Sequence, residues 1–164
     1  FKNEIDWDEI GYHQNLSEDF ILEFKNDLDW DDLSKFQKLS ENFIRKFKYE
    51  VKWDMIEENQ ILSENFIREF DYLINLKNIA LYQKLSEDFI NEYKNKLDWD
   101  LISKCQKLTE NFINENIYKV NLNYIFKYQK IIFSKNFLIK YLQFASKNNR
   151  NFVINRYYLP KRTC

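Results

Sequence analysis

The sequence predicts an all-α fold, an α-solenoid of short helix-turn-helix repeats with two helices in each unit. Three observations support this prediction. The same blocks of sequence return with a period of 23 residues, marked each time by a glutamine: Gln14, Gln37, Gln60, Gln83, Gln106 and Gln129. A fixed period is the strongest sequence signature of a repeat architecture. The 164 residues include one Gly and one Pro, too few for a hairpin-rich β fold, while 15 Phe, 11 Tyr and 4 Trp can supply a core.

The first helix of each unit is predicted to begin after a Ser or Thr. These residues are suitable N-caps, and one or two acidic residues that favour the positive helix end follow each of them: Ser17, Ser40, Ser63, Ser86 and Thr109. In the first complete unit, Leu16 and Ile21 are spaced as a hydrophobic staple. Phe20, Ile21, Phe24 and Leu28 then form an apolar stripe at helical spacing, so we expect this helix to extend over about eleven residues.

The second helix of the unit is predicted to begin after Asp29 and to end near Gln37. Asp29 is a suitable N-cap, and Leu28 and Leu33 are spaced as a second staple. Trp30 and Leu33 should then face inward. Helices of this length, below roughly 12–15 residues, are marginal alone in water, so the units must stabilise one another by stacking.

The glutamine belongs to the joint between the two helices. In QKLSEDFI, residues 83–90, Gln83 ends one helix, Lys84 and Leu85 form the turn, and Ser86 caps the next helix. Backbone groups at helix ends lack partners within the helix, and a glutamine amide offers two donors and an acceptor. We therefore expect the glutamine side chain to satisfy backbone groups at the joint and to pair with the joint of the next unit.

The repeat pattern divides the chain into two regions. Residues 1–132 contain the tandem repeats, and the first repeat is truncated because Phe1 falls in the column of Phe24, which suggests a piece of a longer protein. Residues 133–164 are predicted to form a degenerate, basic repeat that caps the array, with Pro160 stopping its second helix.

Two stretches, DWDLISKCQKLTENFINE and QKLSEDFINEYKNKLDWD, resemble a short tandem repeat that is abundant in predicted proteins of giant DNA viruses and is also found in some phages and AT-rich bacteria. The resemblance covers residues 1–132. It implies a helical repeat of viral or similar origin and carries no known activity. It also implies an intracellular location, namely the host cytoplasm, a viral factory or the virion.

No catalytic, cofactor-binding or metal-binding residue is predicted. The only histidine, His13, shares its repeat column with Phe36, Asn59 and Cys105, which indicates a partly buried packing position for both His13 and Cys105. Gly11 is the only glycine, so a glycine-rich phosphate loop is excluded. Two distant cysteines favour a reducing compartment. No apolar run approaches the roughly 18 residues of a membrane-spanning helix, so no membrane partner is expected.

Charge is distributed unevenly. All 26 acidic residues lie in residues 1–115 with 15 Lys and Arg, whereas residues 116–164 contain ten basic residues and no acidic one. Such asymmetry indicates an anionic partner or head-to-tail self-association. The basic candidates for nucleic-acid binding lie among aromatic residues near the C-terminus: Lys147, Arg150, Arg156, Lys161 and Arg162. The alternative is a capping hairpin with a solvated basic face.

A second set of candidates lies on the second helix of the repeats, in columns that change from unit to unit. These columns hold polar residues in most other repeats but apolar or aromatic ones at Met55, Leu81, Leu101 and Tyr124, and a basic one at Lys127. They indicate a surface for a protein partner, although drift at solvent-facing positions gives the same pattern. The acidic column that begins at Glu18 can balance helix dipoles or attract a basic partner. The sequence thus predicts a non-enzymatic scaffold for protein–protein interaction or assembly, with nucleic-acid binding as the alternative.

Overall fold

The computed structural model describes residues 6–129, 131–147, 149 and 150. Within these ranges all the regular secondary structure is helical, as predicted. One set of helices begins with Trp or Leu, and we call it the Trp row: α1 (Trp7–His13), α3 (Trp30–Phe36), α5 (Trp53–Asn59), α7 (Leu76–Tyr82), α9 (Trp99–Cys105) and α11 (Leu122–Tyr128). The other set follows a Ser or Thr, and we call it the Ser row: α2 (Glu18–Phe24), α4 (Glu41–Lys46), α6 (Glu64–Glu69), α8 (Glu87–Glu92), α10 (Glu110–Glu115) and α12 (Lys135–Tyr141).

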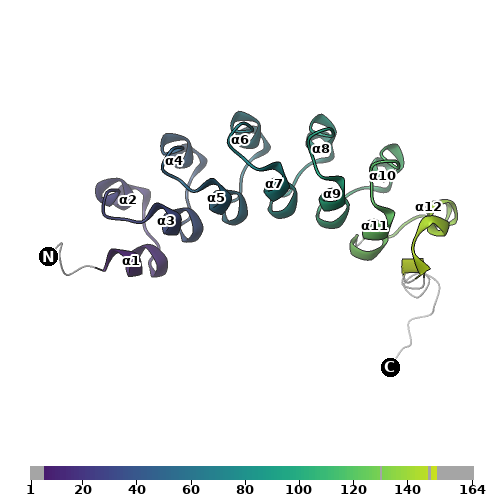
Figure 1. Cartoon of the computed structure of the whole chain (residues 1–164), viewed down its shortest axis with the longest axis horizontal. Coiled ribbons are helices and arrows are strands. Elements are labelled where there is room, and N and C mark those ends of the chain that lie inside the picture. Colours follow the sequence, from purple (N-terminus) through teal and green to yellow (C-terminus); the bar gives the residue numbers. More distant parts are fainter. Residues whose placement is uncertain (1–5, 130, 148, 151–164) are drawn as a thin grey trace, which may run out of the picture. The chain divides into compact units, whose positions relative to one another are not determined.

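The chain divides into two compact units, residues 1–83 and residues 84–164. In the first unit the Trp-row helices α1, α3, α5 and α7 stack in sequence, and α2, α4 and α6 lie in a parallel row beside them (Figure 1). In the second unit α9 packs against α11, and α8, α10 and α12 form the other row (Figure 1). This alternation of short helices in two rows is an all-α solenoid, and the predicted fold class is confirmed.

The helix starts follow the predicted capping chemistry. Ser40 Oγ accepts a hydrogen bond from the backbone N–H of Phe43 at 3.1 Å, and the same bond recurs at every Ser-row helix. Asp29 Oδ1 accepts from the N–H groups of Asp31 and Asp32 at 2.7 and 3.2 Å. A side-chain oxygen at this position satisfies N–H groups that have no partner inside the helix. A side-chain cap therefore marks the start of every described α-helix except α5, whose N-cap residue is Lys52.

The Ser-row helices are shorter than predicted, with six or seven residues in place of about eleven. In the second repeat the backbone leaves α-helical geometry at Phe47, which has φ −114° and ψ 34°. The N–H groups of Glu50 and Val51 both donate to the carbonyl of Phe47 at 3.0 Å. This tight turn brings Val51 into the core and redirects the chain toward the next Trp-row helix. The apolar stripe continues through the turn, which is why the sequence pattern overestimated the helix length.

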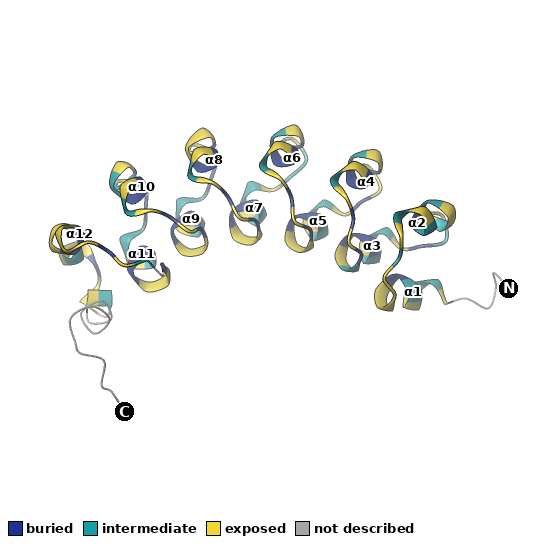
Figure 2. Ribbon diagram, turned by 180° about the vertical axis from the view of Figure 1, so that it is seen from behind, coloured by how far each residue is buried: buried dark blue, intermediate teal, exposed yellow. Residues whose placement is uncertain are grey.

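The core lies between the two rows in each unit, where the facing sides of the helices are buried (Figure 2). In the second repeat the ring of Trp30 lies 5.0 Å from the ring of Phe47, and Phe43 lies 4.8 Å from Phe47. Leu33 and Ile44 have no exposed surface. Burying such side chains contributes roughly 1.5–3 kcal/mol each, which explains how helices of six or seven residues are stable here.

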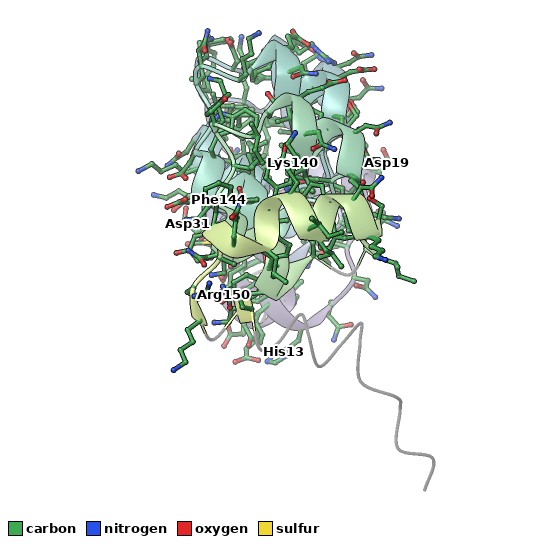
Figure 3. The ribbon with its side chains drawn as sticks, turned by 90° about the vertical axis from the view of Figure 1, so that its right-hand side faces the viewer. His13, Asp19, Asp31, Lys140, Phe144 and Arg150 are labelled. Carbon is green, nitrogen blue, oxygen red and sulfur yellow. The ribbon has the colours of Figure 1, made fainter. Side chains whose placement is uncertain are left out.

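The pattern continues past residue 132 in modified form. Ser134 caps α12, and a 3-10 turn, η2 (Leu142–Phe144), follows it. Figure 3 labels Lys140 and Phe144 on this segment and Arg150 after it. Ser146 then occupies the N-cap position of a further helical turn, because the N–H of Arg150 donates to its carbonyl at 2.9 Å. Pro160 and its predicted role lie outside the described residues.

Candidate binding surfaces

The recurring glutamines bind backbone groups of the preceding repeat. Gln60 Nε2 donates to the carbonyls of Ser34 and Gln37 at 3.1 and 2.7 Å, and its Oε1 accepts from the N–H of Leu39 at 3.1 Å. Gln37, Gln83 and Gln129 each make the same three bonds to the repeat before their own. We call this contact the glutamine clamp. The prediction that the amide satisfies the joint is correct, but its direction was wrong, since it reaches back and not forward.

The clamp is buried, which explains why the residue must be an amide. Gln37, Gln60, Gln83, Gln106 and Gln129 are all buried, whereas Gln14 in the first repeat is exposed. Two buried carbonyls and one buried N–H need two donors and one acceptor in fixed positions, and glutamine carries that set on one side chain. The glutamine column is therefore structural.

The acidic column of the Ser row is also used between repeats. Glu41 Oε1 accepts from the backbone N–H of Ser63 at 2.5 Å, and its Oε2 accepts from Ser63 Oγ at 3.1 Å. Glu87 and Glu110 accept from the N–H and the hydroxyl of the following N-cap residue in the same way, and Glu18 accepts from the N–H of Ser40. These carboxylates hold neighbouring repeats together. The bonds add a contact between repeats to the predicted compensation of the helix dipole.

A third buried column connects successive Trp-row helices. Ser34 Oγ accepts from the N–H of Lys52 at 2.9 Å, and Ser103 Oγ accepts from the N–H of Asn121 at 2.9 Å. In the repeat that follows that of Ser34, Glu57 takes this place. Its Oε1 accepts from the N–H of Asn75 at 2.7 Å. This column was not predicted from the sequence because its residue types differ between repeats. Its fixed position, three residues before each glutamine, was the feature that could have indicated it.

Glu57 is the one buried carboxylate among the described residues, with 1% of its surface exposed. Its Oε2 accepts from Asn78 Nδ2 at 2.8 Å. Burial raises the pKa of this carboxyl above its ordinary value, the hydrogen bonds from Asn75 and Asn78 oppose that shift, and Asp54 adds to it. Because both oxygens are hydrogen-bonded within the stack, Glu57 has a structural position and is not directed toward a cleft.

The predicted partner-binding residues lie on the solvent side of the Trp row. In the first unit Met55 on α5 is half-buried and Leu81 on α7 is exposed. In the second unit Leu101 on α9 and Tyr124 on α11 are half-buried, and Lys127 on α11 is exposed. Within each unit the structure places these residues on stacked helices of one row, so each unit presents a continuous face on which the residue types vary.

His13 and Cys105 are both exposed, which corrects the predicted packing position. Their column lies at the C-terminal end of the Trp-row helices, where His13 Nε2 is 3.2 Å from Glu9 Oε2 one helical turn away. In this column Phe36 is half-buried and the other described members are exposed, so the mixed residue types reflect a surface position. Among the described residues no group of three or more His, Cys, Asp or Glu is arranged to hold a metal ion.

Of the basic C-terminal candidates, Lys147 and Arg150 are described and both are exposed. Arg156, Lys161 and Arg162 lie outside the described residues. Within the described part of the chain, no helix has the length and apolar character needed to cross a membrane.

Two hollows in the second unit were not found from the sequence. One, of about 660 Å³, lies beside Leu122, where a shorter side chain replaces the Trp of other repeats. Its lining includes Tyr118 and Phe144, both largely exposed. The other, of about 490 Å³, lies at the C-terminal ends of α9 and α11. In the sequence, the first hollow is indicated by Leu122 in a column that holds Trp in most other repeats. The second is indicated by lysines that cluster near the joint.

Comparison with protein-family models, with curated proteins and with solved structures gave no match.

Proposed function

We propose that this chain is a non-enzymatic repeat scaffold that binds a protein partner through the solvent side of its Trp row. One observation carries the proposal. The recurring polar columns form hydrogen bonds between repeats, as the side chains of Gln60 and Glu41 do. The solvent-facing columns of the Trp-row helices instead change residue type from repeat to repeat. In repeat proteins the stacked units form an extended surface, and side chains on it that do not pack in the core can contact a partner.

Apolar exposure supports a protein partner. On the Trp row, Leu81 is 39% exposed, and Tyr12 in the same repeat column is 50% exposed. Interface centres are enriched in aromatic and apolar side chains, with few charged ones. On the resemblance to the giant-virus repeat, the scaffold acts inside the host cell, in a viral factory or in the virion.

Differential affinity capture tests this function. The wild-type chain and a Met55→Arg, Leu81→Glu variant are used to capture proteins from an extract of the native source, and a captured candidate is then purified and titrated by calorimetry. The control is Tyr49→Ser, which alters an exposed residue at the Ser-row turn of the same unit. We expect one partner to bind the wild type and the control but not the double variant. Equal recovery by all three proteins, or by none, would contradict the proposal.

Nucleic-acid binding through the C-terminal region is a second candidate function. Residues 116–164 carry ten basic residues and no acidic one, and Lys147 and Arg150 are exposed. Clustered cations neutralise phosphates and give strongly salt-dependent binding. In a mobility-shift titration we expect oligonucleotide binding to weaken when Lys147, Arg150, Arg156, Lys161 and Arg162 are changed to Ala. Unchanged binding would exclude this region as the site.

The same charge asymmetry supports head-to-tail self-association, in which the basic end of one copy binds the acidic region of another. Association driven by charge weakens as salt screens it. Light scattering across a salt series should then show a mass above that of the monomer only at low salt, and a constant monomer mass would rule out this assembly.

A further inference from the structure

The second unit contains a basic and aromatic groove at the C-terminal ends of α9 and α11. Its volume is about 490 Å³. The residues that line it come from the two helix ends and the two joints that follow them: Lys104, Cys105, Gln106, Lys107, Tyr128, Gln129 and Ile131. No acidic side chain is among them. We call this feature the α9–α11 groove.

Two ammonium groups lie near the ring of Tyr128. Lys104 Nζ is 5.7 Å from the centre of its ring, and Lys127 Nζ is 4.9 Å from it. The ring of Tyr124 lies 5.9 Å from that of Tyr128. Lys104, Lys107, Lys127 and Tyr128 are all exposed. Cations within about 6 Å of an aromatic face are attracted to it, so the lysines remain beside a ring that is itself accessible.

The corresponding hollow of the first unit lies between the ends of α3 and α5 and serves as an internal comparison. It is smaller, about 280 Å³, and is lined by Lys35 and Lys38 in the columns of Lys104 and Lys107. The other columns differ, because Asn59 replaces Tyr128 and Glu58 replaces Lys127. The two hollows therefore share a lysine pair, and the groove of the second unit adds Tyr128 to its lining, with Lys127 beside that ring.

Lysines near helix ends have a structural explanation as well, since cations stabilise the negative C-terminal end of a helix. That explanation applies equally to Lys35 on α3 and Lys104 on α9, which both lie in a last helical turn. It does not explain why an exposed tyrosine, Tyr128, lies among the lysines of the α9–α11 groove.

We propose that the α9–α11 groove binds single-stranded nucleic acid, with phosphates at Lys104, Lys107 and Lys127 and a base stacked on Tyr128. Proteins that bind single strands combine a cationic groove with aromatic rings on which bases stack. The unit that carries the groove has 15 Lys and Arg against 7 Asp and Glu. The inference rests on the second candidate function above and assigns it a site separate from Lys147 and Arg150. An acidic peptide would use the lysines but has no need of the tyrosine face.

Fluorescence anisotropy with labelled (dT)20 and the full chain tests the site. The double variant Lys104→Ala, Lys107→Ala should weaken binding about fivefold at moderate salt, since two phosphate contacts are lost. Lys35→Ala, Lys38→Ala is the matched control, because it removes the same two charges from the same repeat columns, and it should bind as the wild type does. Tyr128→Ala should weaken binding by about fivefold or more, whereas Tyr128→Phe, which keeps the ring, should not.

Each other outcome overturns the site in a distinct way. If both lysine pairs weaken binding equally, the oligonucleotide responds to overall charge, and the groove is rejected while nucleic-acid binding stands. If only Lys147→Ala, Arg150→Ala weakens binding, the site lies in the C-terminal region. If labelled poly-Glu binds as tightly as (dT)20 and Tyr128→Ala has no effect, the groove takes acidic chains in general. If the wild type binds no oligonucleotide, the site and the second candidate function both fail. Circular dichroism confirms that each variant is folded.

Discussion

The first unit of the chain carries 10 Lys and Arg against 19 Asp and Glu, a formal net charge of −9, whereas the second carries 15 against 7, a net charge of +8. Beneath these opposite charges the interior contacts are the same. Gln60 in the first unit and Gln129 in the second each bind two carbonyls and one N–H of the preceding repeat. Packing therefore depends on the buried columns, whereas exposed columns outside the N-caps differ between the units.

This difference separates the buried glutamine and apolar columns, which recur in both units, from the exposed columns, which vary between them. The acid-rich unit and the lysine-rich unit share one framework, because the glutamine clamp and the buried apolar columns recur in both. Changes in buried columns should then have equal effects in the two units, and changes in exposed columns should have unequal ones.

Removal of a buried Phe should have the largest effect. Phe66 in the first unit and Phe112 in the second are 1% and 3% exposed. Either change to Ala should lower the free energy of unfolding by about 3–5 kcal/mol, because it removes buried apolar surface and leaves a cavity. Urea denaturation measures the loss. A loss in one unit more than twice that in the other would show that the two cores are not equivalent.

Loss of the glutamine clamp should rank second. Gln60→Ala and Gln129→Ala each leave two carbonyls and one N–H without their partner, which should cost about 2–4 kcal/mol in either unit. Gln14→Ala is the control, since that side chain is exposed. If thermal unfolding shows the same midpoint for Gln60→Ala and Gln14→Ala, the glutamine column reflects repeat duplication and not a physical need.

The pH dependence of stability should distinguish the first unit from the second. Because burial raises the pKa of Glu57 in the folded state, that state binds more protons than the unfolded chain as pH rises from the ordinary value of 4.5. The contribution of Glu57 to stability therefore falls as pH rises through that window, by at most about 1.4 kcal/mol per pH unit. The free energy of unfolding of the wild type and of Glu57→Gln is measured in urea at several pH values. As pH increases, the wild type should lose stability relative to the variant. Ser103, the equivalent residue of the second unit, does not titrate in this window, so Ser103→Ala should show a difference independent of pH.

The smallest effect should come from a surface ion pair of the first unit. Arg45 Nε and Nη2 donate to the two oxygens of Glu69 at 2.8 and 2.7 Å, joining α4 to α6. The hydrogen bond lowers the pKa of Glu69. Because both side chains are exposed, the coupling should be small and should disappear in high salt. A double-mutant cycle with Arg45→Ala and Glu69→Ala, followed by thermal unfolding at low and high salt, measures it, and a coupling that salt does not change would contradict this account.

Local sequence was sufficient for the period, the helix starts and most of the core. Ser40 and Asp29 cap helices because of what their side chains can accept, and Leu33 and Ile44 are buried because of their place in the apolar stripe. The short Ser-row helices were not predicted, since apolar residues such as Val51 keep helical spacing while the backbone has already turned. The exposure of His13 and Cys105 was not predicted either, because a column of mixed residue types looks the same on a surface as in a tolerant interior.

By itself the sequence determined that this protein is an all-α repeat, where each helix begins, and that charge is divided along the chain. Only the tertiary structure decided which repeat each glutamine binds, that Glu41 reaches the cap of the following helix, and that Lys104, Lys107 and Tyr128 meet in one groove. The physical reason is that capping and periodicity act within a few residues, whereas contacts 21 to 26 residues apart depend on how one hairpin stacks on the next.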